Sequence, residues 1–166
     1  MTRFRKFSLV IIILFACTGC DRVTKNMAQK MLAASTPVSL LNDTIRIEYT
    51  ENSGAMLSLG AKLPSEVRFA FFVLFVGLTV CVTLVYAVKT RGLNLRQLIS
   101  LALITSGGIG NFLDRLLNRG AAIDFMNIGI GPIRTGIFNL ADVFIVTGAA
   151  AFILFSLQDQ TRAITT

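Results

Sequence analysis

A run of twenty residues from Phe69 to Val88, FAFFVLFVGLTVCVTLVYAV, contains no charged residue. A helix of about 20 apolar residues is long enough to cross roughly 30 Å of bilayer hydrocarbon. The chain as a whole is also apolar, with 54% hydrophobic residues and a mean hydropathy of +0.70, values too high for an ordinary soluble domain. The sequence therefore predicts an integral membrane protein.

The length of 166 residues leaves room for about four spans and their connections. We expect membrane-spanning helices at about residues 7–26, 68–88, 97–116 and 137–157. The predicted fold class is an all-α polytopic membrane protein of four transmembrane helices. We expect residues 1–166 to form a single membrane-embedded domain, with a small extracytoplasmic β-element between the first two helices.

The basic residues give a net charge of +7, but they flank the apolar runs and form no patch interleaved with aromatic residues. This distribution argues against nucleic acid as a partner. Short cytoplasmic segments of membrane proteins are enriched in lysine and arginine. We therefore expect the N-terminus, the loop at residues 89–96 and the C-terminus on the cytoplasmic side, with an even number of crossings.

The first twenty residues have a basic start, an apolar centre and the ending ACTGC, which is the layout of a secretory signal peptide. The ending also resembles a lipoprotein cleavage box, with Cys20 as the lipid-bearing residue. Three more spans would follow such a cleavage, an unusual plan for a lipoprotein. The favoured interpretation is an uncleaved first span that continues as helix through Asp21 and Lys25, which lie one turn apart and can pair.

Residues 44–51, TIRIEYTE, alternate apolar and polar side chains, the period of a half-buried strand. Asn52, Ser53 and Gly54 then favour a turn. We expect an outer β-element over about residues 38–64. Without further evidence, a surface loop is the favoured interpretation of Asn52 and Gly54.

Three aspartates interrupt the apolar sequence between residues 106 and 143. Acidic residues within a membrane are costly, so they indicate a functional site. With the third span running outward and the fourth inward, Asp114, Asp124 and Asp142 all collect at the outer face. Two close carboxyls in such surroundings share a proton and can hydrolyse an amide as an acid and a base. Three acids could also bind a divalent cation or relay protons in a small transporter.

The chain has no histidine, which excludes the commonest catalytic base and metal ligand. Arg115 follows Asp114 directly and can neutralise it, whereas Asp124 has no basic residue within four positions. By charge balance, Asp124 and Asp142 are the better candidates for the proton-sharing pair. Asn139 and Asp142 also have the spacing of a helix capping box, which could by itself explain both residues.

Five motifs resemble the lipoprotein signal peptidases, also called signal peptidase II. They are DRVTK at 21–25, NSG at 52–54, GGIGNFLDR at 107–115, IDF at 123–125 and FNLAD at 138–142, in this order over nearly the whole chain. The resemblance implies an intramembrane aspartyl endopeptidase of the bacterial inner membrane. It would remove the signal peptide from diacylglyceryl-modified prolipoproteins, cutting before the lipidated cysteine, without a cofactor or metal.

The resemblance implies that Asp124 and Asp142 are the catalytic pair and that Asp21 and Lys25 hold the first span to the others. Residues implied to support or bind the substrate are Asn52, Gly54, Gly107, Asn111, Asp114, Arg115, Asn139 and Ala141. Expected partners are prolipoprotein signal peptides, membrane lipid and peptide antibiotics of the globomycin type. Members of the family usually continue the second motif as NxGAAF, whereas this chain has Met56 and Leu57 at the last two places.

Overall fold

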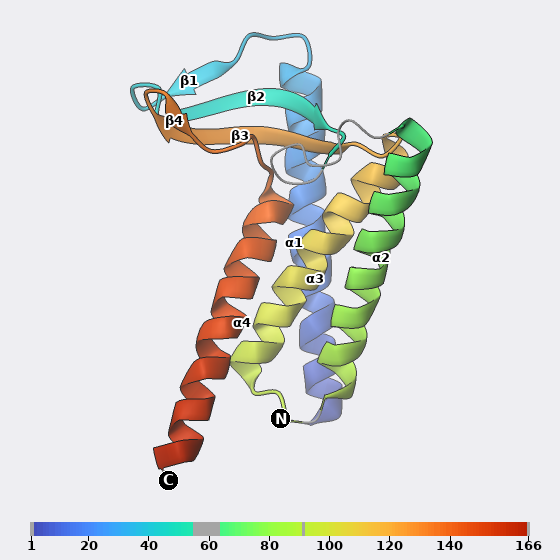
Figure 1. Ribbon diagram of the computed structural model, residues 1–166, viewed down its shortest axis with the longest axis vertical. Helices are drawn as coiled ribbons and strands as arrows, with labels where there is room; N and C mark the ends of the chain where they lie inside the picture. Colours follow the sequence, from blue (N-terminus) through green and yellow to red (C-terminus); the bar gives the residue numbers. More distant parts are fainter. Residues whose placement is uncertain (1, 55–63, 91, 166) are drawn as a thin grey trace.

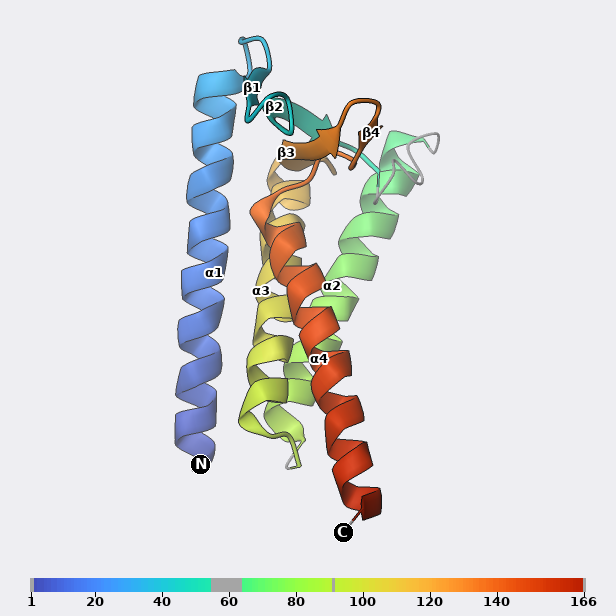
Figure 2. The ribbon, with the colours of Figure 1, turned by 90° about the vertical axis from the view of Figure 1, so that its left-hand side faces the viewer.

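Four helices run side by side, and a small sheet covers one end of them (Figures 1 and 2). The computed structural model describes residues 2–54, 64–90 and 92–165. The helices are α1 (Arg3–Leu32), α2 (Ser65–Lys89), α3 (Leu95–Leu117) and α4 (Leu140–Thr165). The strands are β1 (Val38–Leu40), β2 (Ile45–Asn52), β3 (Ala122–Ile130) and β4 (Ile133–Arg134). Both termini lie at the end away from the sheet (Figure 1).

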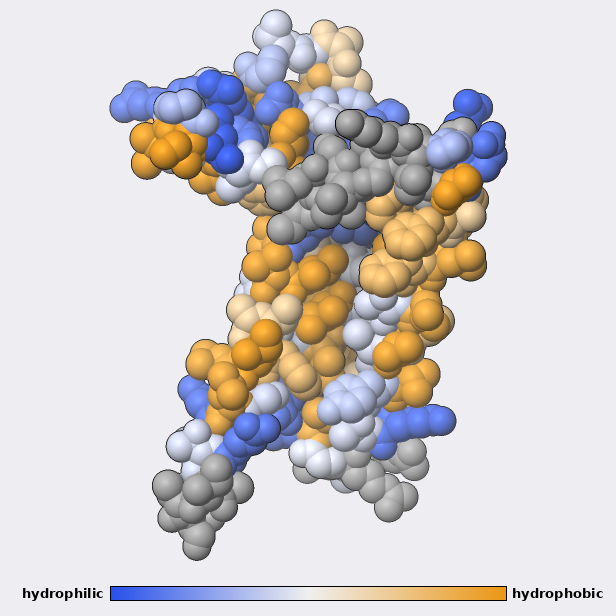
Figure 3. All heavy atoms as spheres, in the orientation of Figure 1, coloured by the Kyte–Doolittle hydropathy of each residue, from blue (hydrophilic) through white to orange (hydrophobic). Residues whose placement is uncertain are grey.

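Three helices in the described part of the chain are long and apolar enough to cross a membrane: Phe4–Leu32, Phe69–Lys89 and Leu140–Thr161. Apolar side chains cover much of the helical surface, and hydrophilic ones gather around the sheet (Figure 3). α1 is one unbroken helix through Cys20, Asp21 and Lys25, as expected from the sequence. The mainly helical architecture with a small antiparallel sheet agrees with the predicted fold class at this level.

α3 is the central helix, because it packs against α1, α2 and α4. It is the most polar of the four inside the molecule, and several of its buried side chains carry hydrogen-bonding groups: Ser100, Thr105, Ser106, Asn111, Asp114 and Arg115. Its first turn is closed by a capping box in which Asn94 and Gln97 bond each other's backbone N–H groups. α3 therefore carries polar groups into the centre of the helical bundle.

Glycines allow α3 and α4 to approach closely. A Cβ atom added to Gly107 would lie 2.3 Å from the carbonyl oxygen of Ala141, and one added to Gly148 would lie 2.7 Å from that of Ser100. Both distances are too short for real atoms. Gly107 and Gly148 are thus required for backbone contact between these helices.

The sheet is antiparallel with strand order β1-β2-β3-β4. β2 confirms the strand expected from the alternation in residues 44–51. β3 and β4 were not predicted, because the sequence indicated a β-element only between the first two helices. Residues 122–128 instead pair with β2, residues 129 and 130 pair with β4, and a turn at Gly131, where φ is +56°, connects β3 to β4. The part of the outer β-element at 55–63, including Met56 and Leu57, lies outside the described residues.

Candidate active site

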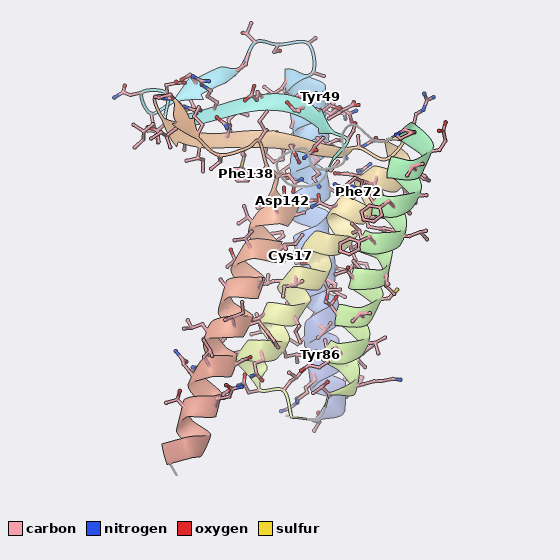
Figure 4. The ribbon with its side chains drawn as sticks, viewed as in Figure 1. Cys17, Tyr49, Phe72, Tyr86, Phe138 and Asp142 are labelled. Atoms are coloured by element: carbon pink, nitrogen blue, oxygen red, sulfur yellow. The ribbon has the colours of Figure 1, made fainter. Side chains whose placement is uncertain are left out.

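Asp124 and Asp142 line one cavity of about 730 Å³ between the sheet, α3 and α4. Asp124 is the third residue of β3, and Asp142 lies in the first turn of α4, directly beneath the sheet (Figure 4). The polar part of the lining also contains Asn52, Asn111 and Arg115. The remainder is mainly apolar and includes Ile137, Phe138, Val143, Ile145 and Val146. The cavity therefore has carboxyl groups at one end and a hydrocarbon-like wall along α4.

Two asparagines connect the aspartates. Asn139 Nδ2 donates to Asp124 Oδ1 at 2.7 Å and to Asn111 Oδ1 at 3.0 Å, and both bonds are buried. Asn111 Nδ2 in turn donates to Asp142 Oδ1 at 2.8 Å. The chain of amides fixes one oxygen of each carboxyl group, which orients the two acids relative to each other.

Asn139 and Asp142 also cap α4 reciprocally, as their spacing predicted. The Asp142 backbone N–H donates to Asn139 Oδ1 at 3.0 Å, and the Asn139 N–H donates to Asp142 Oδ2 at 3.1 Å. The same bonds that begin the helix thus hold the second oxygen of Asp142. Capping and site geometry are two effects of one arrangement, so they are not competing explanations for these residues.

Asn52 reaches the site because β2 contains a bulge. Ile47 pairs with Met126 and Thr50 pairs with Asp124, so β2 advances three residues where β3 advances two. Side chains alternate between faces in a strand, and the extra residue reverses the alternation. Asn52 is thereby turned to the face of Asp124, where its Nδ2 donates to Asp124 Oδ2 at 2.9 Å.

Arg115 spans the site from α3 to the end of β2. Its Nη2 donates to the Gly54 carbonyl oxygen at 3.0 Å, and its guanidinium lies 5.5 Å from the ring centre of Phe72. Gly54 is fixed further by its N–H, which donates to Asn52 Oδ1 at 3.0 Å. Arg115 Nε is buried and has no hydrogen-bond partner among the described residues. Within the described part of the chain, one donor of this guanidinium is thus left without a hydrogen bond.

Asp114 is neutralised by α1, which corrects the expectation that Arg115 pairs with it. Lys25 Nζ lies 2.8 Å from Asp114 Oδ2 and 2.8 Å from Asp21 Oδ2, and Arg22 Nη1 lies 2.8 Å from Asp114 Oδ1. Arg22 was not among the residues predicted from the sequence, although it lies one residue after Asp21 in the first motif. Spacing within α3 favoured Arg115, but that side chain is directed to Gly54.

This buried ion network touches the aspartate pair through Asn111. Lys25 Nζ donates to Asn111 Oδ1 at 3.1 Å, the oxygen that also accepts from Asn139. With its oxygen held by two donors, Asn111 can present only its NH₂ group to Asp142. The other carboxylate of the network, Asp21, accepts the Ala141 N–H at 2.9 Å, which ties α1 to the start of α4.

The predicted supporting residues thus fall into two groups. Asn52, Asn111, Arg115 and Asn139 line the cavity. Gly54, Asp114 and Ala141 hold those residues or their helices in position, and Gly107 lies at the contact of α3 with α4, away from the cavity lining.

Burial in this site raises the pKa of Asp124 from 3.8 to about 6. Desolvation is the main cause, the negative charge of Asp142 adds to it, and the hydrogen bonds from Asn52 and Asn139 oppose it. A carboxyl group with this pKa keeps its proton in mildly acidic conditions and can donate it. Among residues 2–54, 64–90 and 92–165, no three Cys, Asp or Glu side chains come together so that they could hold a metal ion.

Comparisons with known proteins show the family of the chain. A family model described as signal peptidase (SPase) II matches residues 12–158. The lipoprotein signal peptidase of Borrelia hermsii (strain HS1 / DAH) is 31% identical over 158 residues, 92% of each chain. That of Halothermothrix orenii (strain H 168) is 31% identical over 152 residues, 92% of this chain and 97% of its own.

Solved structures show the same fold. A bacterial membrane enzyme determined at 1.9 Å resolution by the in meso method is 25% identical and superposes with a TM-score of 0.79, over 92% of this chain and 94% of its own. A second one, at 2.3 Å, is 24% identical with a TM-score of 0.80.

Proposed function

The chain belongs to the signal peptidase II family, a bacterial membrane peptidase family, and we propose that it works as an intramembrane aspartyl endopeptidase. Its proposed substrates are diacylglyceryl-modified prolipoproteins, and the bond cut is the one before the lipidated cysteine. The observation that carries the proposal is the pair Asp124 and Asp142 in one cavity, joined through Asn139 and Asn111.

In the proposed mechanism the two carboxyl groups share one proton, which Asp124 holds because burial raises its pKa to about 6. Asp142 removes a proton from water as the water oxygen attacks the scissile carbonyl carbon, and Asp124 gives its proton to the carbonyl oxygen. When the tetrahedral intermediate collapses, Asp142 passes its proton to the leaving amine and Asp124 regains one from the intermediate. Each acid ends as it began, so the cycle needs no imidazole, thiol or metal.

The cavity suits an apolar peptide that approaches from the bilayer. Its wall along α4 is apolar from Val143 to Val146, and the face between α4 and α2 is hollowed and largely apolar in Figure 3. Arg115 lines the polar end of the cavity, where its positive charge would attract a substrate carbonyl oxygen. A globomycin-type peptide inhibitor would occupy the same cavity.

We further propose that α3 crosses the membrane as the third of four spans. Basic residues lie near the helix ends away from the sheet, among them Lys6, Lys89 and Arg96, and the positive-inside rule assigns that end to the cytoplasm. The termini are then cytoplasmic, and the aspartate pair lies near the outer leaflet of the inner membrane. We treat residues 1–166 as a single peptidase domain.

The proposal is tested by incubating the purified protein in lipid vesicles with one precursor in two forms, with and without the diacylglyceryl group. We expect cleavage of the modified form at the bond before its cysteine, with little cleavage of the unmodified form and no effect of a metal chelator. Equal cleavage of both forms would contradict the proposed substrate class. Loss of activity with chelator would contradict the aspartyl mechanism.

A further inference from the structure

The outer part of the sheet has one apolar face and one polar face. Side chains directly opposite each other in paired strands share a face, and alternate residues of a strand share a face. Starting from Asp124, the register assigns the following residues to its face: Met126, Ile128 and Ile130 in β3, Ile45 and Ile47 in β2, Val38 and Leu40 in β1, and Ile133 in β4. All eight are apolar.

The opposite face carries polar and charged residues. Ser39 pairs with Arg46, Arg46 pairs with Asn127, and Gly129 pairs with Arg134. Asp43, in the turn between β1 and β2, accepts hydrogen bonds from Arg46 and Arg134. The hydrogen bond from Arg46 lowers the pKa of the Asp43 carboxyl group. This face is therefore suited to water.

The apolar face is uncovered where the sheet extends past the helices. Ile130 and Ile133, at the end of the β3–β4 hairpin, are 80% and 82% exposed, and Val38 and Leu40 of the edge strand are exposed as well. The free end of the sheet projects beyond α4 in Figure 1, and apolar side chains gather below its hydrophilic ones in Figure 3. Five of the eight, Val38, Leu40, Ile128, Ile130 and Ile133, are exposed, which is more than scattered surface residues.

We propose that this apolar face rests on the lipid bilayer, with Ile130 and Ile133 inserted among the lipid chains at the outer surface. The face is on the side of Asp124, and Asp124 is directed toward the start of α4. It therefore continues the apolar surface of the membrane helices, and the polar face with Arg46, whose side chain is 40% exposed, is turned to water. If the apolar face were instead a contact site for a second copy of the protein, it would not need to continue the apolar surface of the membrane helices.

Contact between the sheet and the bilayer also affects the position of Asp124. β3 carries Ile130 at one end and Asp124 six residues earlier, and both belong to one continuous strand paired with β2. A bilayer that fixes the hairpin end also fixes the height of Asp124 above the membrane helices. The lipid surface thus becomes part of what positions the acid.

The chain contains no tryptophan, so a single introduced tryptophan reports its own surroundings. We would replace Val38, Ser39 and Leu40 in turn by tryptophan, since all three side chains of this edge strand are exposed. The variants are reconstituted in vesicles of phosphatidylethanolamine and phosphatidylglycerol, with and without lipid brominated near the carbonyl end of an acyl chain. Ile130→Trp and Ile133→Trp test the hairpin end in the same way.

We expect blue-shifted emission and loss of most of it in brominated vesicles for tryptophan at 38, 40, 130 and 133. Tryptophan at 39 should emit as in water and keep its emission. Emission that is water-like at all positions, or shielded but not quenched by bromine as for a protein partner, would overturn the proposal. No substrate is used, so the result does not depend on the peptidase mechanism.

Discussion

Asn111 and Asn139 orient the two aspartates by uncharged donors. A lysine or arginine in hydrogen-bond contact would favour the ionised form of both carboxyl groups and lower their pKa values. An amide N–H also holds a carboxyl oxygen in place, but it disfavours the protonated carboxyl group less than a positively charged donor does. Lys25, which contacts the side-chain oxygen of Asn111, forms its ion pairs with Asp21 and Asp114.

The pH dependence of cleavage follows from Asp124. Its pKa is raised, so the group keeps its proton below about pH 6 and loses it as the pH rises through that value. Because the proposed mechanism needs this proton, kcat/KM should fall with an alkaline limb near pH 6, a value that belongs to the coupled pair. The measurement is cleavage of a lipid-modified precursor between pH 5 and about pH 9; a flat profile would argue against a proton held by Asp124.

Lys25 should be essential to stability. Its side chain is fully buried and neutralises Asp21 and Asp114. Lys25→Met leaves two carboxylates without this partner, and breaking a buried pair costs about 3 to 5 kcal/mol. We expect a clearly lower midpoint of thermal unfolding in detergent. Lys30→Met, at an exposed position of the same helix, is the matched control and should leave the midpoint unchanged.

At the scale of elements, the sequence predicted β2 but not β3. The alternation in residues 44–51 is regular, whereas β3 is buried on both faces over its first four residues and reads as a continuous mixture of apolar and polar side chains. The bulge in β2 could not be predicted from the sequence either, since it depends on the pairing of β2 with β3. The turn at Gly131 and Pro132 was the available signal for a hairpin.

The contact of α3 with α4 depends on Gly107. An alanine there would place its Cβ against the backbone of Ala141, which cannot move aside as a flexible side chain can. We expect Gly107→Ala to lower the unfolding midpoint, by an overpacking cost of about 1 to 3 kcal/mol or more. Gly19→Ala in α1 meets no atom within 4 Å and should be neutral or stabilising by up to about 1 kcal/mol; equal effects of both changes would refute this account of the contact.

At the scale of the whole molecule, the residues of the site were predictable from sequence because the motifs recur in a known family. Their partners were not all predictable, because they come from helices far apart in the chain: Arg22 lies 92 residues from Asp114. α3 is absent from the three helices that qualify as spans by hydropathy, since its buried polar residues serve the interior of the bundle. The polar residues that α3 carries into the bundle lower its mean hydropathy, so a hydropathy criterion does not identify it as a span.

A crossing by α3 can be tested with single cysteines. With Cys17, Cys20 and Cys81 replaced by alanine, Gly92→Cys and Arg119→Cys mark the two ends of α3 at exposed positions. In intact spheroplasts a membrane-impermeant thiol reagent should label position 119 and not position 92. Labelling of both, or of position 92 alone, would contradict the proposed topology.

The most direct test of the central claim is the rate of precursor cleavage by Asp124→Asn and Asp142→Asn. Each change keeps the shape of the side chain but removes the carboxyl group, and we expect each to reduce kcat by orders of magnitude with the unfolding midpoint largely retained. Asp159→Asn, at the far end of α4, is the matched control and should cleave at the normal rate. Normal cleavage by either folded site variant would contradict the shared-proton mechanism.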